Sequence, residues 1–341
     1  MGKTTLINAN NLGPTMALWL ATDMYDYAPA DAPKDGLPIL SVTQLLKPTK
    51  ALILAQQVPD ADNKVELESL TSSRIGQSIH MAIEAAFENP NRDVLLKSLG
   101  FPGGLVDKLE LNPSAEFVKS HPDAIPMYLE KRAYRKIRTS AGTWVWISGK
   151  FDQVIAGRPE DNKSTKVYSY IKMDQTEKGN YALQMAMYRW LNPDIITSDV
   201  GVINFIFTDW KANEAGRTPN YPPRPVMEMP VSLMSEDDAE RFIRAKLDEL
   251  EMNAGKPQQD MIRCADEELW RAPDVFKYYA NEDVAKANGR ATKNFDTMAQ
   301  ALAYKQEKGK GVIVTVPGEV KRCSYCDAAP VCEQRLEYQT D

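Results

Sequence analysis

Histidine and cysteine are scarce in this sequence, with two and four residues respectively among 341. Four cysteines in a chain of this length do not form the dense disulfide framework of small secreted domains. No stretch approaches the roughly 20 apolar residues that a membrane-spanning helix needs, and the N-terminus lacks the apolar run of a secretory signal. These absences predict a protein of a reducing compartment, the cytoplasm, with no membrane partner.

An excess of basic residues is also missing, because 41 Lys and Arg stand against 47 Asp and Glu, for a formal charge of −6. This balance excludes a uniformly basic nucleic-acid coat but allows a local basic channel, because binding follows the distribution of charge. Hydrophobic residues are 43% and charged residues 26% of the chain, as in ordinary globular proteins. Collagen-like, disordered and coiled-coil classes are therefore excluded.

Three regions are predicted along the chain. Residues 1–36 form an irregular N-terminal extension, because turn-forming Asn, Pro and Gly interrupt them. Residues 37–255 form the core, and residues 256–341 form a polar segment that contains all four cysteines. At 341 residues the chain accommodates one large domain or two.

The core alternates between helical and strand patterns. Apolar residues spaced by four predict a helix over 73–88, and alternating residues predict a β-hairpin within 125–157. A strand over 166–173, a helix over 179–191 and a strand over 200–210 follow. This order predicts an α/β fold with a mixed sheet.

A few polar side chains in this core are candidates for a functional site. His80 lies at the margin of the helix's apolar stripe, where a cleft can open or where a hydrogen-bonded core-edge histidine is ordinary. Asp152 is predicted inside an apolar strand, where an acid is costly unless a cation or hydrogen-bond donors compensate it. Lys172, on the next predicted strand, offers that cation, either in a functional site or in a structural ion pair.

Four short motifs resemble, in their order along the chain, those of the RecB-type PD-(D/E)XK nucleases, and most of all phage-encoded members related to the CRISPR-associated exonucleases. They are Gly76-x-x-x-His80, Gly149-Lys150-Phe151-Asp152, a strand ending in Ile171-Lys172, and Gln184-x-x-x-Tyr188. The resemblance implies a mixed β-sheet flanked by helices, followed by a cysteine-clasped segment. It also implies that His80 and Asp152 bind metal, that Lys172 orients or activates the attacking water, and that Gln184 and Tyr188 steady the site and the DNA backbone.

The third motif departs from the family pattern, which requires an acid two residues before the lysine. Tyr170 occupies that position here. A phenol is a poor ligand for Mg²⁺ at neutral pH, whereas carboxylates gather this ion readily. The departure implies a degenerate, non-cleaving site, unless Asp174 or Glu84 replaces the missing acid.

The cysteines form a second constellation. Cys323 and Cys326 make a C-x₂-C motif, Cys332 follows, and Cys264 alone can complete a set of four. Such a set binds a [4Fe–4S] cluster or a structural Zn²⁺. The resemblance favours iron–sulfur, while unliganded thiols stay an alternative.

Basic residues gather in two places. A run over 131–138 adjoins the Asp152 hairpin and predicts phosphate-backbone contacts by Arg132, Arg135, Lys136 and Arg138 together with Lys150. The alternative is a solvated edge strand, on which charges prevent aggregation. A second basic region lies near the cysteines and contains Lys286, Arg290, Lys293, Lys305, Lys308, Lys310, Lys321 and Arg322.

The function predicted first is a DNA-binding protein on a RecB-like nuclease fold with a degenerate site. It would hold single-stranded or end-bearing DNA and recruit phage replication, recombination or transcription proteins in the host cytoplasm. One alternative is an active DNA exonuclease that uses Mg²⁺ or Mn²⁺. The other is a protein-interaction module that inhibits or recruits a host enzyme.

Overall fold

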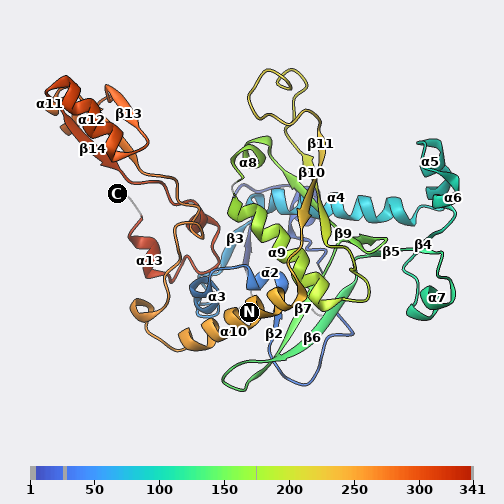
Figure 1. Cartoon of the computed structure of the whole chain (residues 1–341). Helices are drawn as coiled ribbons and strands as arrows, with labels where there is room; N and C mark the ends of the chain where they lie inside the picture. The colour runs from blue at the N-terminus through green and yellow to red at the C-terminus, as the bar shows by residue number, and fades with distance from the viewer. Residues whose placement is uncertain (1–4, 26–28, 174, 339–341) are drawn as a thin grey trace. The chain divides into compact units, whose positions relative to one another are not determined.

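The structure is a computed structural model that describes residues 5–25, 29–173 and 175–338 (Figure 1). The chain forms two compact units. The larger unit contains the described parts of Gly2–Lys47 and Pro59–Met252, and the smaller one combines Pro48–Val58 with the described part of Asn253–Asp341. Residues 48–58, predicted as part of the core, therefore cluster with the cysteine-containing segment. Asp174, one of the two suggested replacement acids, lies outside the described residues, and the other, Glu84, lies on helix α4 (Thr71–Glu88).

A six-stranded mixed sheet forms the centre of the larger unit. Its strands, in spatial order, are β11 (Val226–Ser232), β10 (Val200–Phe207), β9 (Arg158–Thr165), β8 (Gln153–Ile155), β5 (Ile125–Leu129) and β4 (Leu109–Leu111). The pairs β9–β10 and β4–β5 are parallel, and the other three pairs are antiparallel. The predicted mixed sheet is confirmed.

A second, three-stranded sheet consists of β2 (Ile39–Ser41), β7 (Trp144–Lys150) and β6 (Arg132–Arg138). The predicted hairpin is confirmed, because β6 and β7 pair antiparallel from Arg132 opposite Lys150 to Arg138 opposite Trp144. The chain passes from β5 into β6 and from β7 into β8, so two neighbouring stretches switch between the sheets at the same corner.

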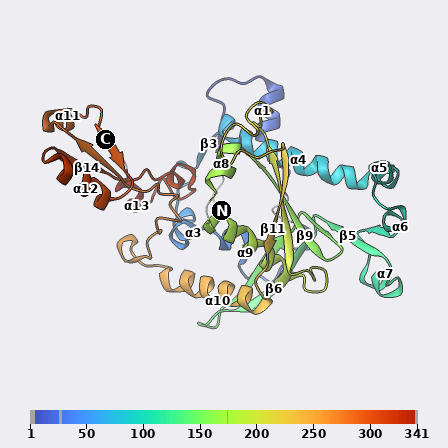
Figure 2. The same ribbon diagram turned by 45° about the horizontal axis from the view of Figure 1, so that its top comes forward.

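Long helices pack beside these strands (Figures 1 and 2). They are α4 (Thr71–Glu88), α9 (Gln175–Leu191) and α10 (Glu236–Asn253). Helix α9 contacts β6, β7, β10 and β11, and its Met185, Met187 and Trp190 are fully buried in the main core. A Cβ at Gly149 would lie 2.6 Å from Leu191 Cδ1 and 2.9 Å from Tyr188 Cδ1, so this glycine allows α9 to approach β7 closely.

One element differs from the prediction. Val167–Lys172 forms helix α8 rather than a strand, and the strand lies earlier, as β9. A two-residue turn, Ala156-Gly157 with φ of +50° and +81°, joins β8 to β9 as in type I′ hairpins. Strand β9 reads Arg-Pro-Glu-Asp-Asn-Lys-Ser-Thr, a composition that rarely forms strands. Neighbours on both sides compensate, because β9 pairs with β8 and β10.

The smaller unit has its own antiparallel sheet in the order β13 (Lys293–Phe295), β12 (Val275–Tyr279) and β14 (Val312–Val316). Its helices are α3 (Thr49–Ala55), η2 (Gln258–Asp260), α11 (Glu282–Lys286), α12 (Met298–Lys308), η3 (Arg322–Tyr325) and α13 (Glu333–Leu336). The remaining short elements of the larger unit are β1 (Thr5–Ile7), α1 (Pro14–Ala21), α2 (Val42–Leu45), β3 (Lys64–Glu66), η1 (Leu67–Leu70), α5 (Arg92–Ser98), α6 (Gly103–Val106) and α7 (Ala115–Ser120). Among the described residues, no helix combines the length and the apolar character that a membrane crossing requires.

Candidate functional site

Two acids lie at the corner where the chain switches between the two sheets. Glu130 lies between β5 and β6, and Asp152 lies between β7 and β8. The Glu130 backbone N–H donates to the Asp152 carbonyl oxygen over 2.8 Å, which joins the two stretches. Glu130 has a left-handed φ of +48°, and its carboxylate forms an ion pair with Lys150.

Strand β9 brings an acid and a lysine to Asp152. The backbone N–H of Asn162 donates to Asp152 Oδ2 over 2.8 Å. Asp161 and Lys163 flank Asn162 in the strand. Because side chains alternate along a strand, the side chains of Asp161 and Lys163 point to the same face of the sheet, opposite to the face of Asn162. Lys163 Nζ lies 2.6 Å from Asp161 Oδ2. This oxygen is buried and accepts no hydrogen bond among the described residues beyond that ion pair.

His80 reaches the cluster from helix α4. Its Nε2 lies 2.9 Å from the carbonyl oxygen of Asn162, and its Nδ1 lies 3.5 Å from Asp152 Oδ2. A carbonyl only accepts, so Nε2 carries the hydrogen of this bond, and Nδ1 is the ring nitrogen that faces Asp152. A histidine that binds metal through one nitrogen commonly donates its other N–H to a carbonyl in this manner. Gly76 places α4 against β9, since its Cβ position lies 3.2 Å from Ser164 Oγ.

Burial and repulsion between like charges dominate the electrostatics of the cluster. Burial and the neighbouring Asp161 raise the pKa of Asp152 to about 7, although His80, the Asn162 N–H and Lys163 oppose the shift. Burial favours the neutral amine of Lys163, but Asp161 and Asp152 outweigh that effect and raise its pKa. The carboxylates of Asp152 and Asp161 repel each other, and the single ammonium of Lys163 neutralises only one of the two negative charges. A divalent cation would supply the missing positive charge.

Ligand atoms of His80, Glu130 and Asp152 all lie within 4.8 Å of one another. Carboxylates with few nitrogen donors suit Mg²⁺ and Mn²⁺ better than Zn²⁺ or Cu²⁺. The donor chemistry therefore fits the ions that the family resemblance implies, and Asp161, outside this group, acts on Asp152 through its charge.

Helix α9 places Gln184 and Tyr188 beside the acids. Gln184 Nε2 donates to the Tyr188 hydroxyl over 2.9 Å, and both side chains are buried. Burial, followed by the charge of Asp161, raises the pKa of Tyr188 well above its usual range. The phenol therefore stays protonated next to the carboxylates.

Lys172 and Tyr170 do not belong to this cluster. Lys172 is exposed at the end of α8. Tyr170 packs edge-on against Phe205 and Phe207, with ring centroids 5.1 and 5.0 Å apart, so it is an aromatic core residue. The strand predicted over 166–173 was wrong, because Val167–Lys172 forms helix α8.

The basic residues of β6 make contacts within the chain. The Arg135 guanidinium lies 4.3 Å from the Trp190 ring centroid and donates to the Trp190 carbonyl. Lys136 pairs with Asp35 at 3.1 Å, and Arg138 donates to the Gly142 carbonyl. Arg138 is also six strand residues, about 20 Å, from Arg132 at the acidic corner. Strand β6 is at the edge of its sheet, as the alternative of a solvated edge strand requires, and DNA contacts by these residues stay a prediction.

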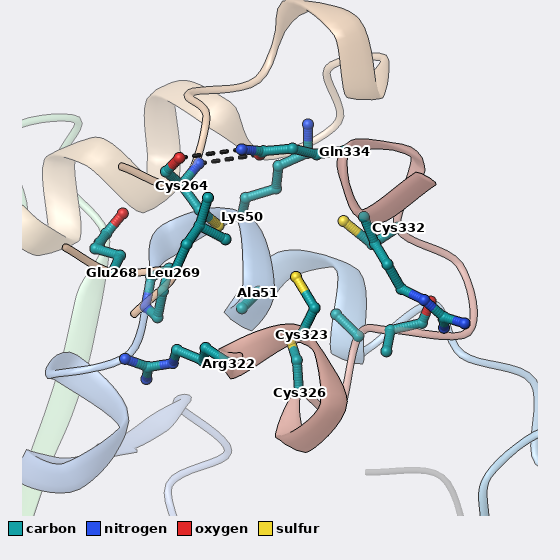
Figure 3. A pocket seen from close by; sticks show the side chains of 14 residues that line it. Lys50, Ala51, Cys264, Glu268, Leu269, Arg322, Cys323, Cys326, Cys332 and Gln334 are labelled. Atoms are coloured by element: carbon teal, nitrogen blue, oxygen red, sulfur yellow. Dashed lines mark hydrogen bonds between the residues drawn. The ribbon is translucent and has the colours of Figure 1, made fainter. Parts of the chain in front are cut away.

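All four cysteines line one cavity of about 30 Å³ in the smaller unit (Figure 3). Cys264 is fixed by Gln334, whose amide exchanges two 3.0 Å hydrogen bonds with the Cys264 backbone. Burial, then Glu268 and the other three cysteines, raise the pKa of the Cys264 thiol to about 12. The four thiols are unpaired. Burial also raises the pKa of the Cys323 and Cys326 thiols. Four thiols that line one cavity, three of them with a raised pKa, fit a thiolate-bound metal centre.

No family model and no curated protein matches this chain. Among solved structures it is similar to SSO0001, with 12% identity and a TM-score of 0.37 over 67% of this chain and 83% of that one. A phage-related exonuclease from Haemophilus somnus 129PT is similar with 13% identity and a TM-score of 0.22, over 48% and 84%. Rai1 of Scheffersomyces stipitis, in complex with (3'-NADP)+ and calcium, has 11% identity and a TM-score of 0.20, over 89% and 78%. Such low scores do not assign a function, so the geometry of this chain carries the argument.

The sequence patterns missed three members of the cluster: Glu130, Asp161 and Lys163. A signal for two of them was present, because Asp161-Asn162-Lys163 is an acid-x-Lys pattern nine residues after Asp152. The Ala156-Gly157 pair also marks a tight turn that starts a new strand. Glu130 had no such signal, because only the switch between sheets brings it to Asp152.

Proposed function

We propose that this chain is a DNA nuclease of the RecB-type PD-(D/E)XK kind that depends on Mg²⁺ or Mn²⁺ and retains both core acids. The observation that carries the proposal is the acid-x-Lys pattern of Asp161 and Lys163 on β9, beside Asp152. This pattern supplies the acid that the sequence analysis missed at Tyr170. The proposal therefore favours the active enzyme over the degenerate DNA-binding protein.

Asp152, Asp161, Glu130 and His80 would hold the ion. Once bound there, it would supply a Lewis acid for a phosphate oxygen and a water of lowered pKa. Lys163 stays protonated beside the two acids, so it would orient the attacking water or a phosphate oxygen by hydrogen bonding rather than accept a proton. Gln184 and Tyr188, buried beside Asp161, would keep that carboxylate in position.

The substrate we propose is single-stranded or end-bearing DNA. We also propose that the four cysteines bind a metal centre, either a [4Fe–4S] cluster or Zn²⁺. Support for the metal centre comes from the shared cavity of the thiols. At this centre, Arg322 and Arg335 would offset thiolate charge, since they favour the ionised forms of Cys326 and Cys323 respectively. Partners in phage replication, recombination or transcription also stay part of the proposal.

Degradation of end-labelled single-stranded, duplex and closed circular DNA with Mn²⁺ or Mg²⁺ tests the proposal. Purified protein should degrade linear DNA and spare closed circles, and Asp161→Asn should reduce the rate by roughly 10²-fold or more, as loss of charge stabilisation does elsewhere. Tyr170→Phe serves as the matched control, because it keeps the aromatic packing and should retain full activity.

DNA that is bound but left intact with either metal would restore the degenerate, DNA-binding interpretation. Cleavage that survives Asp161→Asn undiminished would show that the reaction occurs elsewhere on the chain. Attack on closed circles would contradict the requirement for DNA ends and leave the metal-dependent nuclease standing.

A further inference from the structure

The smaller unit contains a basic insertion between Cys264 and the other three cysteines. Residues 275–316 carry seven Lys and Arg against four Asp and Glu, a net charge of +3 within a chain of −6. They form β12, α11, β13, α12 and β14. The chain enters and leaves this insertion through a tight neck, where the Ala272 N–H donates to the Glu319 carbonyl over 2.9 Å.

The insertion has its own small core, which orders the strands and the loop that carry its charges. Tyr304 of α12 packs on Tyr278 and Phe295, with ring centroids 5.1 and 5.2 Å apart. Tyr278 is fully buried, and its hydroxyl donates to the Lys310 carbonyl over 2.9 Å. A rigid scaffold of this kind positions the residues of the strands and loop beside it.

A groove of about 410 Å³ opens beside β12 and β13. Its lining consists of Lys277, Gly289, Arg290, Ala291, Thr292, Lys293 and Asn294. Three of these seven residues are cationic, and none is acidic. The volume falls in the range of about 300–1,000 Å³ that ligand sites occupy, but the lining lacks their usual apolar walls. A charged, hydrated ligand fits such a lining better than an apolar one.

Two cations of the insertion outside the groove are paired with acids, whereas Lys305 and Lys310, also outside it, form no ion pair among the described residues. Lys286 pairs with Glu282, and Lys308 pairs with Glu307. Lys277 and Arg290 form no ion pair among the described residues, and Lys293 lies over the Phe295 and Tyr304 rings. Like charges gathered without an acid repel one another, and an anion in the groove would relieve that repulsion.

We infer that this groove binds the phosphodiester backbone of DNA, as a second contact separate from the acidic cluster. The choice of DNA rests on the proposed function, whereas the preference for a polyanion rests on the groove alone. Lysine on a short edge strand such as β13 also prevents aggregation. That explanation does not cover Lys277 in the central strand or Arg290 in the loop.

Binding of fluorescein-labelled oligothymidylate (20 nucleotides) to the full chain tests the inference, in an Asp161→Asn background that keeps the DNA intact. Lys277→Gln with Arg290→Gln should weaken binding by roughly fivefold or more and reduce the salt slope by about 1.4, or 0.7 for each lost contact. Lys286→Gln with Lys308→Gln removes the same charge from ion-paired sites and should change affinity less than about twofold. Both variants leave the Lys293 stack in place, and thermal melting checks their folding.

An equal loss of DNA affinity in both double variants, or no loss in Lys277→Gln with Arg290→Gln, would refute the inference that the groove binds DNA. So would equally tight, groove-dependent binding of a polyglutamate peptide of the same length, which would indicate an acidic protein partner instead. Cleavage is measured separately with the chain that retains Asp161. Absent cleavage with groove-dependent binding would refute the proposed function alone, and cleavage with groove-independent binding would refute this inference alone.

Discussion

The backbone N–H of Glu130 donates to the carbonyl oxygen of Asp152 over 2.8 Å, and this bond ties together the two places where the chain crosses between sheets. Glu130 keeps a left-handed φ of +48° there, which costs a non-glycine residue about 1–2 kcal/mol. The strained conformation brings its carboxylate within 4.8 Å of ligand atoms of Asp152 and His80. The strained backbone of Glu130 therefore lies where two acids and a histidine come together, and backbone strain of this kind is common at functional sites.

Glu130→Gln should weaken Mn²⁺ binding by roughly tenfold or more while leaving the fold intact, because it removes one charged ligand and keeps the side-chain shape. Calorimetric titration with Mn²⁺ measures the effect. Glu110→Gln, at an exposed acid on β4, is the matched control and should bind Mn²⁺ as the unaltered chain does. Equal affinities for all three proteins would remove Glu130 from the metal site.

Lys163→Ala should reduce DNA cleavage by roughly 10²-fold or more, because it removes the ammonium that lies 2.6 Å from Asp161. Lys172→Ala removes the same functional group from an exposed position on α8 and should leave the rate unchanged. Single-turnover rates with saturating Mn²⁺ separate the chemical step from metal binding. The reverse result would restore Lys172, the lysine that the sequence analysis favoured.

Helices and the apolar strands of the core could be predicted from the sequence because their side chains have a clear period. Apolar residues repeat every four positions in α4, and aromatic and β-branched residues dominate β10. Strand β9 has no such period. Its polar side chains are tolerated because neighbours satisfy them, as when Asn162 donates to Gln153 Oε1 and accepts from Asn204 Nδ2.

The missed strand β9 also shaped the prediction of the site. With a strand over 166–173, the residue two positions before its lysine is Tyr170, and the sequence then predicts a degenerate site. Residues fixed by short motifs on correctly predicted elements, His80 and Asp152, do lie together. Contacts that depend on how strands pair, such as that of Glu130 with Asp152, require the three-dimensional fold.

The raised pKa of Asp152 predicts that this carboxylate destabilises the metal-free protein when it is ionised. Burial and Asp161 raise the folded-state pKa from 3.8 to about 7, so the folded state holds this proton more tightly than the unfolded state does. The penalty is absent below pH 3.8, grows as the pH rises toward 7, and is constant above 7. Asp152→Asn should therefore raise the melting temperature of the metal-free protein at pH 8 and have little effect near pH 4.

Differential scanning calorimetry of the metal-free protein at several pH values measures this dependence. Asp123→Asn, at an exposed loop acid, should shift the melting temperature equally little at every pH. A gain from Asp152→Asn that is as large at pH 4 as at pH 8 would show that packing rather than charge is responsible.

The cysteine cavity predicts that metal and structure are lost together in the smaller unit. Two hydrogen bonds with Gln334 join Cys264 to the C-terminal segment. Cys323, Cys326 and Cys332 follow in the sequence after the insertion of residues 275–316. Few buried apolar residues hold this region, whose small core is Leu54, Met261 and Ala328 with a few half-buried neighbours. Metal–thiolate bonds would then supply much of its folding free energy.

Protein purified without oxygen should contain iron with sulfide, or one equivalent of zinc. Cys264→Ser should lose that metal and become as sensitive to protease after residue 253 as Cys326→Ser, because each removes one of four ligands. Ser324→Ala, at the exposed residue within the C-x₂-C motif, should retain both metal and resistance. Full metal content in Cys264→Ser would show that the fourth ligand is another group, and metal-free protein of unchanged protease resistance would show that the thiols stabilise this unit without metal.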